Sequence, residues 1–231
     1  MSVKQVSKSS IAQGIPKGSK AWDQTSSTAF AAELLLVGGG GGGSGDGCYS
    51  GGGGGGQARD LSITIGLAQT YSITIGAGAY MATGGSSTAF GYTAVGGGSS
   101  PQYAGGTSGD GYTGGAGAIC PGCCASGGGG GGSRGYGSAA AGCSTHGLGG
   151  SGLNWKSLGT TYAVGGRGMN NCTGGGNGGS NTGNGAAGNA TGGSGIAIVR
   201  YLGSAKATGG TITSTGGYTY HTFTSNGNLV T

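Results

Sequence analysis

Residues 37–56 read VGGGGGGSGDGCYSGGGGGG and contain fourteen glycines in twenty positions. Glycine loses more backbone freedom on folding than any other residue, and it has no side chain to bury in return. The tract directly follows Leu34-Leu35-Leu36-Val37, the most apolar run in the chain. Either the tract stays loose, or glycine fills a structural role there that no other residue can fill.

The composition argues against two common glycine-rich classes. The chain has 231 residues, of which 67 are glycine and 6% are charged. Scarce large apolar residues are typical of disordered chains, but disorder also requires a high net charge, and the net charge here is only +5. A collagen triple helix is excluded because glycine does not recur at every third position and there are only three prolines.

The large aliphatic residues cluster in segments with the period-two pattern of half-buried β-strands. These segments are 32–37, 61–66, 71–76 and 195–202. We expect them to form one sheet, in which GLAQTY joins the two SITIG copies as a hairpin loop. Residues 209–231 alternate Thr, Tyr, Ile and Phe with small polar residues and are also predicted to be β. No stretch has a convincing helical period, so we expect an all-β or irregular fold with minimal α-helix.

The body from Ala77 to Gly195 is 119 residues long and contains 43 glycines. Ordering it opposes folding by about 100–200 kcal/mol, which its sparse side chains cannot offset. In an extended threefold helix every backbone N–H and C=O points outward. Helices without side chains can approach until these groups hydrogen-bond to one another. We therefore expect polyglycine-II-like helices and loops on a small β-platform; the alternative is a mobile, unordered loop region.

Four motifs occur in order along the chain: LLLVGGGGGG, AQTYSITIGAGA, GSSTAFGYTAVGGG and GGSGIAIVRYLG. Together they resemble the glycine-rich domain of phage tail fibres, phage adhesins and other virion appendages, over residues 30–202. In that family an aliphatic strand runs into a polyglycine block, and a GGSGIVIVRY-like strand closes the domain. The segment GGYTYHTFTSNGNLV resembles one that usually precedes the opening strand, but here it stands at the C-terminus.

This resemblance divides the chain into three parts. Residues 1–30 are expected to form an arm that docks to other virion proteins, residues 31–202 the glycine-rich domain, and residues 203–231 a C-terminal β segment. The C-terminal segment is expected to pair beside Leu34–Val37, as in a circular permutation, or with a neighbouring subunit. An exposed strand edge at a chain end invites the second outcome.

Charge and apolar content set expectations for partners. The first twenty residues lack the apolar core of a signal peptide, and AAELLLV is too short to span a bilayer. Lys and Arg are not interleaved with aromatic residues as in nucleic-acid binding. We expect no membrane insertion and no nucleic-acid partner. Because one chain buries little apolar area, we expect a homo-oligomer, with a trimer on a fibre axis favoured.

The sequence contains no constellation of residues for catalysis. Its two histidines and five carboxylates form no cluster. Residues 131–135 match G-x-S-x-G, but glycine and serine are so frequent that the match arises by chance, and the strand–turn–helix setting is missing. His146 and His221 are interpreted as ordinary polar residues. We expect no enzyme activity and no cofactor.

The cysteines are candidates for disulfide bonds, because an even number of cysteines in a body with little core suggests cross-links. They are Cys48, Cys120, Cys123, Cys124, Cys143 and Cys172. Cys120-Pro121-Gly122-Cys123 has the spacing of half a zinc site, but no second half is evident, so no metal site is predicted. Pro121-Gly122 favours a turn that brings Cys120 near Cys123, so that one bridge closes locally and another reaches a distant strand or a neighbouring chain. Free buried thiols are the alternative.

Five aromatic residues in short polar loops are candidates for receptor contact, since amphipathic rings on such loops make adaptable binding surfaces. They are Tyr103, Tyr112, Tyr136, Trp155 and Tyr162. The alternative is that these rings fold back onto the glycine body. Trp155, in GLNWKSLG, is the leading candidate.

The resemblance implies a virion structural protein of a tailed phage, made in the host cytoplasm and located in the virion. As a tail-fibre or adhesin component it would attach to a host cell-surface glycan or an outer-membrane protein. A head or tail decoration protein without receptor binding is the main alternative. An antifreeze-like or cell-wall glycine-rich structural protein is a third.

Overall fold

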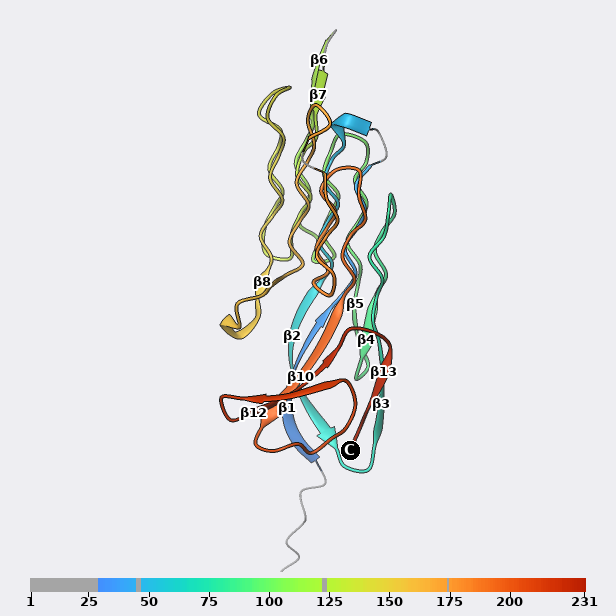
Figure 1. Ribbon diagram of the computed structural model, residues 1–231, viewed down its shortest axis with the longest axis vertical. Coiled ribbons are helices and arrows are strands. Elements are labelled where there is room, and N and C mark those ends of the chain that lie inside the picture. Colours follow the sequence, from blue (N-terminus) through green and yellow to red (C-terminus); the bar gives the residue numbers. More distant parts are fainter. Residues whose placement is uncertain (1–28, 45–46, 122–123, 174) are drawn as a thin grey trace, which may run out of the picture.

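The computed structural model describes residues 29–44, 47–121, 124–173 and 175–231. Two β-sheets lie at one end of an elongated molecule, and extended glycine-rich stretches run from them toward the other end (Figure 1). In the described residues the helices are two single 3₁₀ turns, η1 (Gly47–Tyr49) and η2 (Trp155–Ser157). The expected all-β, irregular fold class is confirmed. Most of the predicted arm, residues 1–28, lies outside the described residues.

The larger sheet is antiparallel, with strand order β11-β12-β10-β1-β2. Its strands are β1 (Ala29–Val37), β2 (Ala58–Gly66), β10 (Ile196–Leu202), β11 (Thr211–Thr215) and β12 (Tyr218–Phe223). The second sheet has the order β13-β3-β4-β5. Its strands are β3 (Thr70–Thr74), β4 (Ser87–Ala89), β5 (Tyr92–Ala94) and β13 (Gly227–Val230). We name these two sheets the platform.

Two short hairpins lie in the glycine-rich region between β5 and β10. One pairs β6 (Ala118–Cys120) with β7 (Cys124–Ser126), and the other pairs β8 (Leu153–Asn154) with β9 (Thr161–Tyr162).

The apolar run Leu34–Val37 is continuous because both faces of β1 are covered. All four side chains are 0% exposed. Leu34 and Leu36 belong to a core that also contains Ile73 and Leu229 of the second sheet. Leu35 and Val37 belong to a core on the opposite face, together with Trp155 and Tyr162. A strand alternates apolar and polar residues only where one of its faces meets water, and the end of β1 has no such face.

The predicted single sheet is wrong for the second SITIG copy. That copy contributes β3 to the second sheet, and in the described residues no ladder joins β3 to β2. The linker GLAQTY therefore carries the chain from one sheet to the other. Ile63, Ile65 and Ile73 then meet in one core, so the two copies share a core without sharing a sheet.

The C-terminal segment pairs within the chain, but not beside Leu34–Val37. β12 pairs with β10, and β13 pairs with β3. Both edges of β1 are already taken, one by β10 and the other by β2. The segment therefore adds β11 and β12 to the larger sheet and β13 to the second sheet, and it connects the two sheets.

The extended glycine-rich stretches pack side by side, and we name this packed part of the chain the bundle. Three runs of six glycines, 38–43, 51–56 and 127–132, are buried within it. The backbone N–H groups of the first run donate in three directions that repeat every three residues. Gly38 and Gly41 donate to residues 54–57, Gly39 and Gly42 to residues 82–85, and Gly40 and Gly43 to residues 190–193. A repeat of three residues per turn, without internal hydrogen bonds, is the signature of an extended threefold helix.

The carbonyl groups of the same run accept hydrogen bonds from three further stretches. Gly39 and Gly42 accept from residues 97–100, Gly40 accepts from Ala79, and Gly41 accepts from Ala186. The run is therefore surrounded on all sides by other parts of the described chain. The run 51–56 repeats this arrangement: it donates to residues 98–102, 128–131 and 183–186 and accepts from residues 106–109, Gly166 and Gly41.

No side chain fits at the positions of the first hexaglycine run. A Cβ atom on any residue of 38–43 would lie 1.2–2.2 Å from a backbone atom of a neighbouring stretch. Because successive residues face different neighbours, all six positions require glycine. At the surface the constraint relaxes, and a Cβ on Gly176 would meet nothing within 4 Å. The expected lattice of glycine helices is confirmed, and consecutive glycines mark its interior.

Candidate binding tip

Connecting loops of the glycine helices point toward the end of the molecule opposite the platform and end there at different heights (Figure 1). The hairpin β6–β7 is the outermost element there. We name the described residues of these loops the tip. They are residues 44, 47–50, 80–83, 101–104, 118–121, 124–126, 141–146, 170–173 and 188–191.

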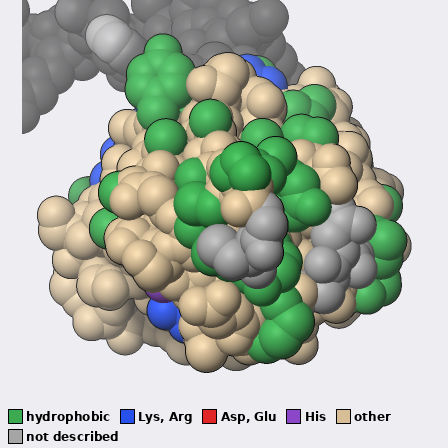
Figure 2. All heavy atoms as spheres, turned by 90° about the horizontal axis from the view of Figure 1, so that it is seen from above, with side chains coloured by type: hydrophobic (Ala, Val, Ile, Leu, Met, Phe, Trp, Pro, Cys, Tyr) green, Lys and Arg blue, Asp and Glu red, His purple; other side chains and the backbone are tan. Residues whose placement is uncertain are grey.

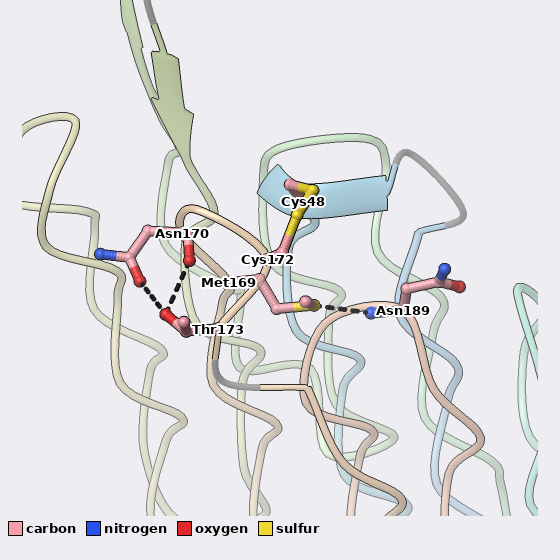
Figure 3. The surroundings of a disulfide bond; sticks show 6 residues. All are labelled: Cys48, Met169, Asn170, Cys172, Thr173 and Asn189. Atoms are coloured by element: carbon pink, nitrogen blue, oxygen red, sulfur yellow. Dashed lines mark hydrogen bonds between the residues drawn. A yellow bond between two sulfur atoms is a disulfide. The ribbon is translucent and has the colours of Figure 1, made fainter.

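Two disulfides cross-link the tip loops. Cys48 is bonded to Cys172, which lies 124 residues further along the chain (Figure 3). Cys120 is bonded to Cys143, and their Cα atoms are 6.0 Å apart. Both bridges join different loops, so the predicted local closure from Cys120 to Cys123 is wrong for Cys120. Cys123 itself lies outside the described residues.

Hydrogen bonds between loops add to these cross-links. Asn170 donates from its side-chain amide to the carbonyl of Ser144, and Ser44 donates from its hydroxyl to the carbonyl of Gln102. The Tyr80 hydroxyl donates to Asn189 Oδ1 at 2.8 Å. The loops therefore position one another, although few large side chains lie beneath them.

Figure 3 shows how the loop that carries Cys172 is braced. The Thr173 hydroxyl donates to the backbone carbonyl of Asn170 at 2.8 Å and lies 3.0 Å from its Oδ1. On the other side, the backbone N–H of Asn189 donates to the sulfur of Met169 at 3.2 Å. The loop is thereby tied to the neighbouring loop 188–191.

The described residues of the tip carry no charged Asp, Glu, Lys or Arg side chain. Tyr80, Met81 and Ile119 are exposed by 52%, 52% and 68%. Figure 2 views the molecule from this end, and hydrophobic side chains gather around the centre of the face, whereas Lys and Arg appear toward its margin. The surface suits a partner that offers apolar or neutral hydrogen-bonding groups.

Only one of the five predicted receptor-contact residues, Tyr103, belongs to the tip. Tyr112 and Tyr136 pack edge to face with ring centroids 5.1 Å apart. They follow the turns that contain Asp110 and Arg134, and these two residues bond to the N–H and C=O of Ala58, the first residue of β2. This tyrosine pair therefore lies at the platform end of the bundle.

The other two candidates, Trp155 and Tyr162, are core residues. Their exposed fractions are 0% and 7%, and burial raises the pKa of the Tyr162 hydroxyl. Trp155 donates from Nε1 to Asp60 Oδ1 at 2.9 Å, and the guanidinium of Arg200 lies 5.2 Å from its ring centroid. The prediction that Trp155 contacts a receptor is wrong, because its ring closes the outer face of the larger sheet.

A cluster of ion pairs holds the β8–η2–β9 segment against the larger sheet. Lys156 Nζ lies 2.9 Å from Glu33 Oε1 and 3.2 Å from Asp60 Oδ2, and Arg200 Nε lies 2.5 Å from Glu33 Oε2. Burial alone would raise the pKa of the Glu33 carboxyl, but the hydrogen bonds and charges of Lys156 and Arg200 outweigh it and lower that pKa. The pKa of Lys156 is raised, chiefly by its hydrogen bond to Glu33 and further by its interactions with Asp60.

Sequence reasoning missed Tyr80, Met81 and Ile119. Their common signal is a break of non-glycine residues between two glycine-rich stretches, as in GAGAYMATGG and GGAGAICPG. Since each helix of the bundle is several residues long, such breaks mark where the chain reverses. The glycine pattern thus indicates where along the sequence the loops occur. It does not indicate whether a given loop lies at the tip or at the platform end of the bundle.

The fold and the tip define a class of protein: a β-platform that carries a bundle of glycine helices and displays cross-linked loops at the far end. A family model described as "Glycine-rich domain" matches residues 17–202, and the chain belongs to this family. The match ends at the last residue of β10, so β11, β12 and β13 lie beyond it. Neither the curated proteins nor the solved structures include a match to the chain.

Across the described residues, no helix is long and apolar enough to cross a membrane.

Proposed function

We propose that this chain is a structural protein of a tailed-phage virion, a tail-fibre or adhesin component that attaches the particle to its host through the tip. The four ordered motifs within residues 30–202 support this assignment, as does membership of the glycine-rich family. The target is a cell-surface glycan or an outer-membrane protein. Both offer the neutral and apolar groups that Tyr80, Met81 and Ile119 complement.

The observation that carries the proposal is the separation of the two ends. β1 begins at the platform end, and the tip lies at the opposite end (Figure 1). A protein that is attached to a particle near Ala29 would hold its tip outward. The backbone lattice between them is stiff, because the runs 38–43 and 51–56 are hydrogen-bonded to neighbouring stretches on several sides.

Docking of residues 1–30 to other virion proteins and assembly into a homo-oligomer, with a trimer favoured, belong to the same proposal. Composition alone favours an oligomer because one chain has too few large side chains to order the glycine body. That reason does not hold in the folded chain, because the hexaglycine runs find their hydrogen-bond partners within it. The oligomer stays a prediction that rests on the fibre analogy alone.

Adsorption of particles to host cells tests the proposal. Tyr80→Ser and Ile119→Ser alter exposed tip residues, and Leu202→Ser is the matched control, because Leu202 on the platform is 66% exposed against 68% for Ile119. The tip variants should incorporate normally and adsorb about 30-fold more weakly, the effect of losing a contact of about 2 kcal/mol. The control should adsorb as the parent does.

Normal adsorption of a particle that carries both tip substitutions would reject the receptor-binding function. The protein would then be a head or tail decoration protein. Equal loss with Leu202→Ser would assign the contact to the platform and would also contradict the proposal.

A further inference from the structure

Three sulfur atoms converge at the outermost part of the tip. The Sγ atoms of Cys120, Cys124 and Cys143 all lie within 4.8 Å of one another. Cys120 and Cys124 face each other across the β6–β7 hairpin, where they are paired in register. Cys143 comes from the loop 141–146 and forms the disulfide with Cys120. Two loops thus bring a third cysteine sulfur close to an existing disulfide.

The spacing of these sulfurs fits a thiolate metal site. In a tetrahedral zinc site with Zn–S bonds of about 2.3 Å, neighbouring sulfurs lie about 3.8 Å apart. When the Cys120–Cys143 bond is reduced, its two sulfurs move apart toward that value, and Cys124 has to approach by no more than about 1 Å. The hairpin and the loop already hold the three side chains on one side of the tip.

A nitrogen donor lies close by in the sequence. His146 follows Cys143 by three residues, and its Nδ1 is buried without a hydrogen-bond partner in the described part of the chain. Thiolates and imidazole are the ligands that zinc prefers. The three thiolates, whose sulfurs lie within 4.8 Å of one another, therefore favour a soft cation over Mg²⁺ or Ca²⁺.

We propose that the reduced protein binds one Zn²⁺ ion through the thiolates of Cys120, Cys124 and Cys143. The metal and the disulfide exclude each other because both need Cys120 and Cys143. In a reducing compartment, zinc ties the hairpin to loop 141–146, and in an oxidising one the disulfide makes the same connection. The tip is thus cross-linked in both the reduced and the oxidised protein.

Conversion of the zinc-bound form to the disulfide form requires a two-electron oxidant, for example a disulfide such as oxidised glutathione. The Cys120 and Cys143 thiolates form one S–S bond and pass two electrons to the oxidant, whose own S–S bond breaks to give two thiols. Zn²⁺ leaves, and the Cys124 thiolate takes up a proton. Three protons are consumed in all, two by the glutathione thiolates and one by Cys124.

The test uses the full chain, reduced with a phosphine, in a Cys123→Ser background so that only described cysteines contribute. Titration with Co²⁺ should give the near-ultraviolet band of thiolate-to-cobalt charge transfer at one ion per chain, and Zn²⁺ should remove it. Cys124→Ser should weaken binding about 100-fold or more, since even outer-shell changes cost 10–100-fold. Cys48→Ser, in the other disulfide of the tip, is the matched control and should leave the titration unchanged.

Alkylation followed by mass spectrometry gives a readout without the Cys124 substitution, in case that variant folds poorly. Zn²⁺ should protect Cys120, Cys124 and Cys143 of the reduced chain, while Cys48 and Cys172 are modified. Absence of the cobalt band in the reduced chain, or equal modification of all five cysteines with Zn²⁺ present, would overturn the proposal. So would a titration that Cys48→Ser weakens as much as Cys124→Ser does.

Discussion

The carbonyl oxygen of Gly41 lies 2.1 Å from the point that a Cβ atom on Gly53 would occupy. At the same place the N–H of Gly41 donates to the carbonyl of Gly54 at 2.9 Å. The two hexaglycine runs therefore touch backbone to backbone, and the obstacle to a side chain is a carbonyl group that is itself hydrogen-bonded. It cannot move aside without breaking bonds in the lattice.

Gly53→Ala should therefore destabilise the protein strongly. The added methyl group has to displace the backbone of residues 41–42, and overpacking costs about 1–3 kcal/mol, or more where no flexible side chain can yield. Urea unfolding followed by circular dichroism measures the loss, and failure to obtain folded protein is an equally clear result.

Gly176→Ala is the control for that experiment. A Cβ on Gly176 meets nothing within 4 Å, so the substitution should change the free energy of unfolding by less than about 0.5 kcal/mol. If the two variants were equally stable, glycine would not be required in the interior, and the lattice would not be the source of order.

Much of this fold can be predicted from sequence because glycine runs and aliphatic runs are both unambiguous. Leu34–Val37 and residues 195–202 share one sheet as expected, since their apolar residues are continuous. The place of β3 cannot be predicted, because the same SITIG letters suit either sheet of a sandwich. A strand's pattern specifies which side chains are buried, but not which neighbour covers them.

Trp155→Ala should lower stability rather than adsorption alone. The ring is completely buried in the core that contains Leu35 and Val37, and truncation of a buried Trp costs about 3–5 kcal/mol. Thermal unfolding of the purified chain measures this loss. Trp155→Phe retains a ring but not the hydrogen bond to Asp60, so it should lose less stability than Trp155→Ala; equal stability of all three proteins would contradict the burial.

The misplacement of Trp155 has a physical cause. Its immediate neighbours in GLNWKSLG are polar or small, which is typical of an exposed loop. The residues that bury it, including Leu35 and Ile198, come from distant parts of the chain, and Lys156 turns back to pair with Glu33 and Asp60. The composition of a short segment does not indicate contacts with residues that are far away in the sequence.

The ion-pair cluster predicts loss of stability in acid. The pKa of Glu33 is lowered in the folded protein from an ordinary value of 4.5. Its contribution to stability is therefore fully present above about pH 4.5 and is lost as the pH falls through the lower pKa of the folded state. Urea unfolding between pH 2 and pH 7 should show this loss in the parent chain.

Glu33→Gln should reduce the loss of unfolding free energy at acid pH, because the side chain no longer titrates. Lys156→Met removes one of the two cationic partners and should give an intermediate slope. A Glu33→Gln variant with the same loss at acid pH as the parent would show that other carboxyls carry the effect.

The last prediction compares the two disulfides of the tip. Each bridge restricts the unfolded chain, and the restriction grows with the logarithm of the loop that it closes. Cys48–Cys172 spans 124 residues and Cys120–Cys143 spans 23, so removing the first pair should cost about 1.5 kcal/mol more than removing the second. Two double alanine variants, unfolded in urea under non-reducing conditions, provide the comparison. Because both bridges join loops of the same tip, their removal disturbs the folded state in a similar way, and the difference reports mainly on the unfolded chain. A larger loss for the Cys120–Cys143 pair would instead mean that the β6–β7 hairpin depends on its bridge for its folded structure.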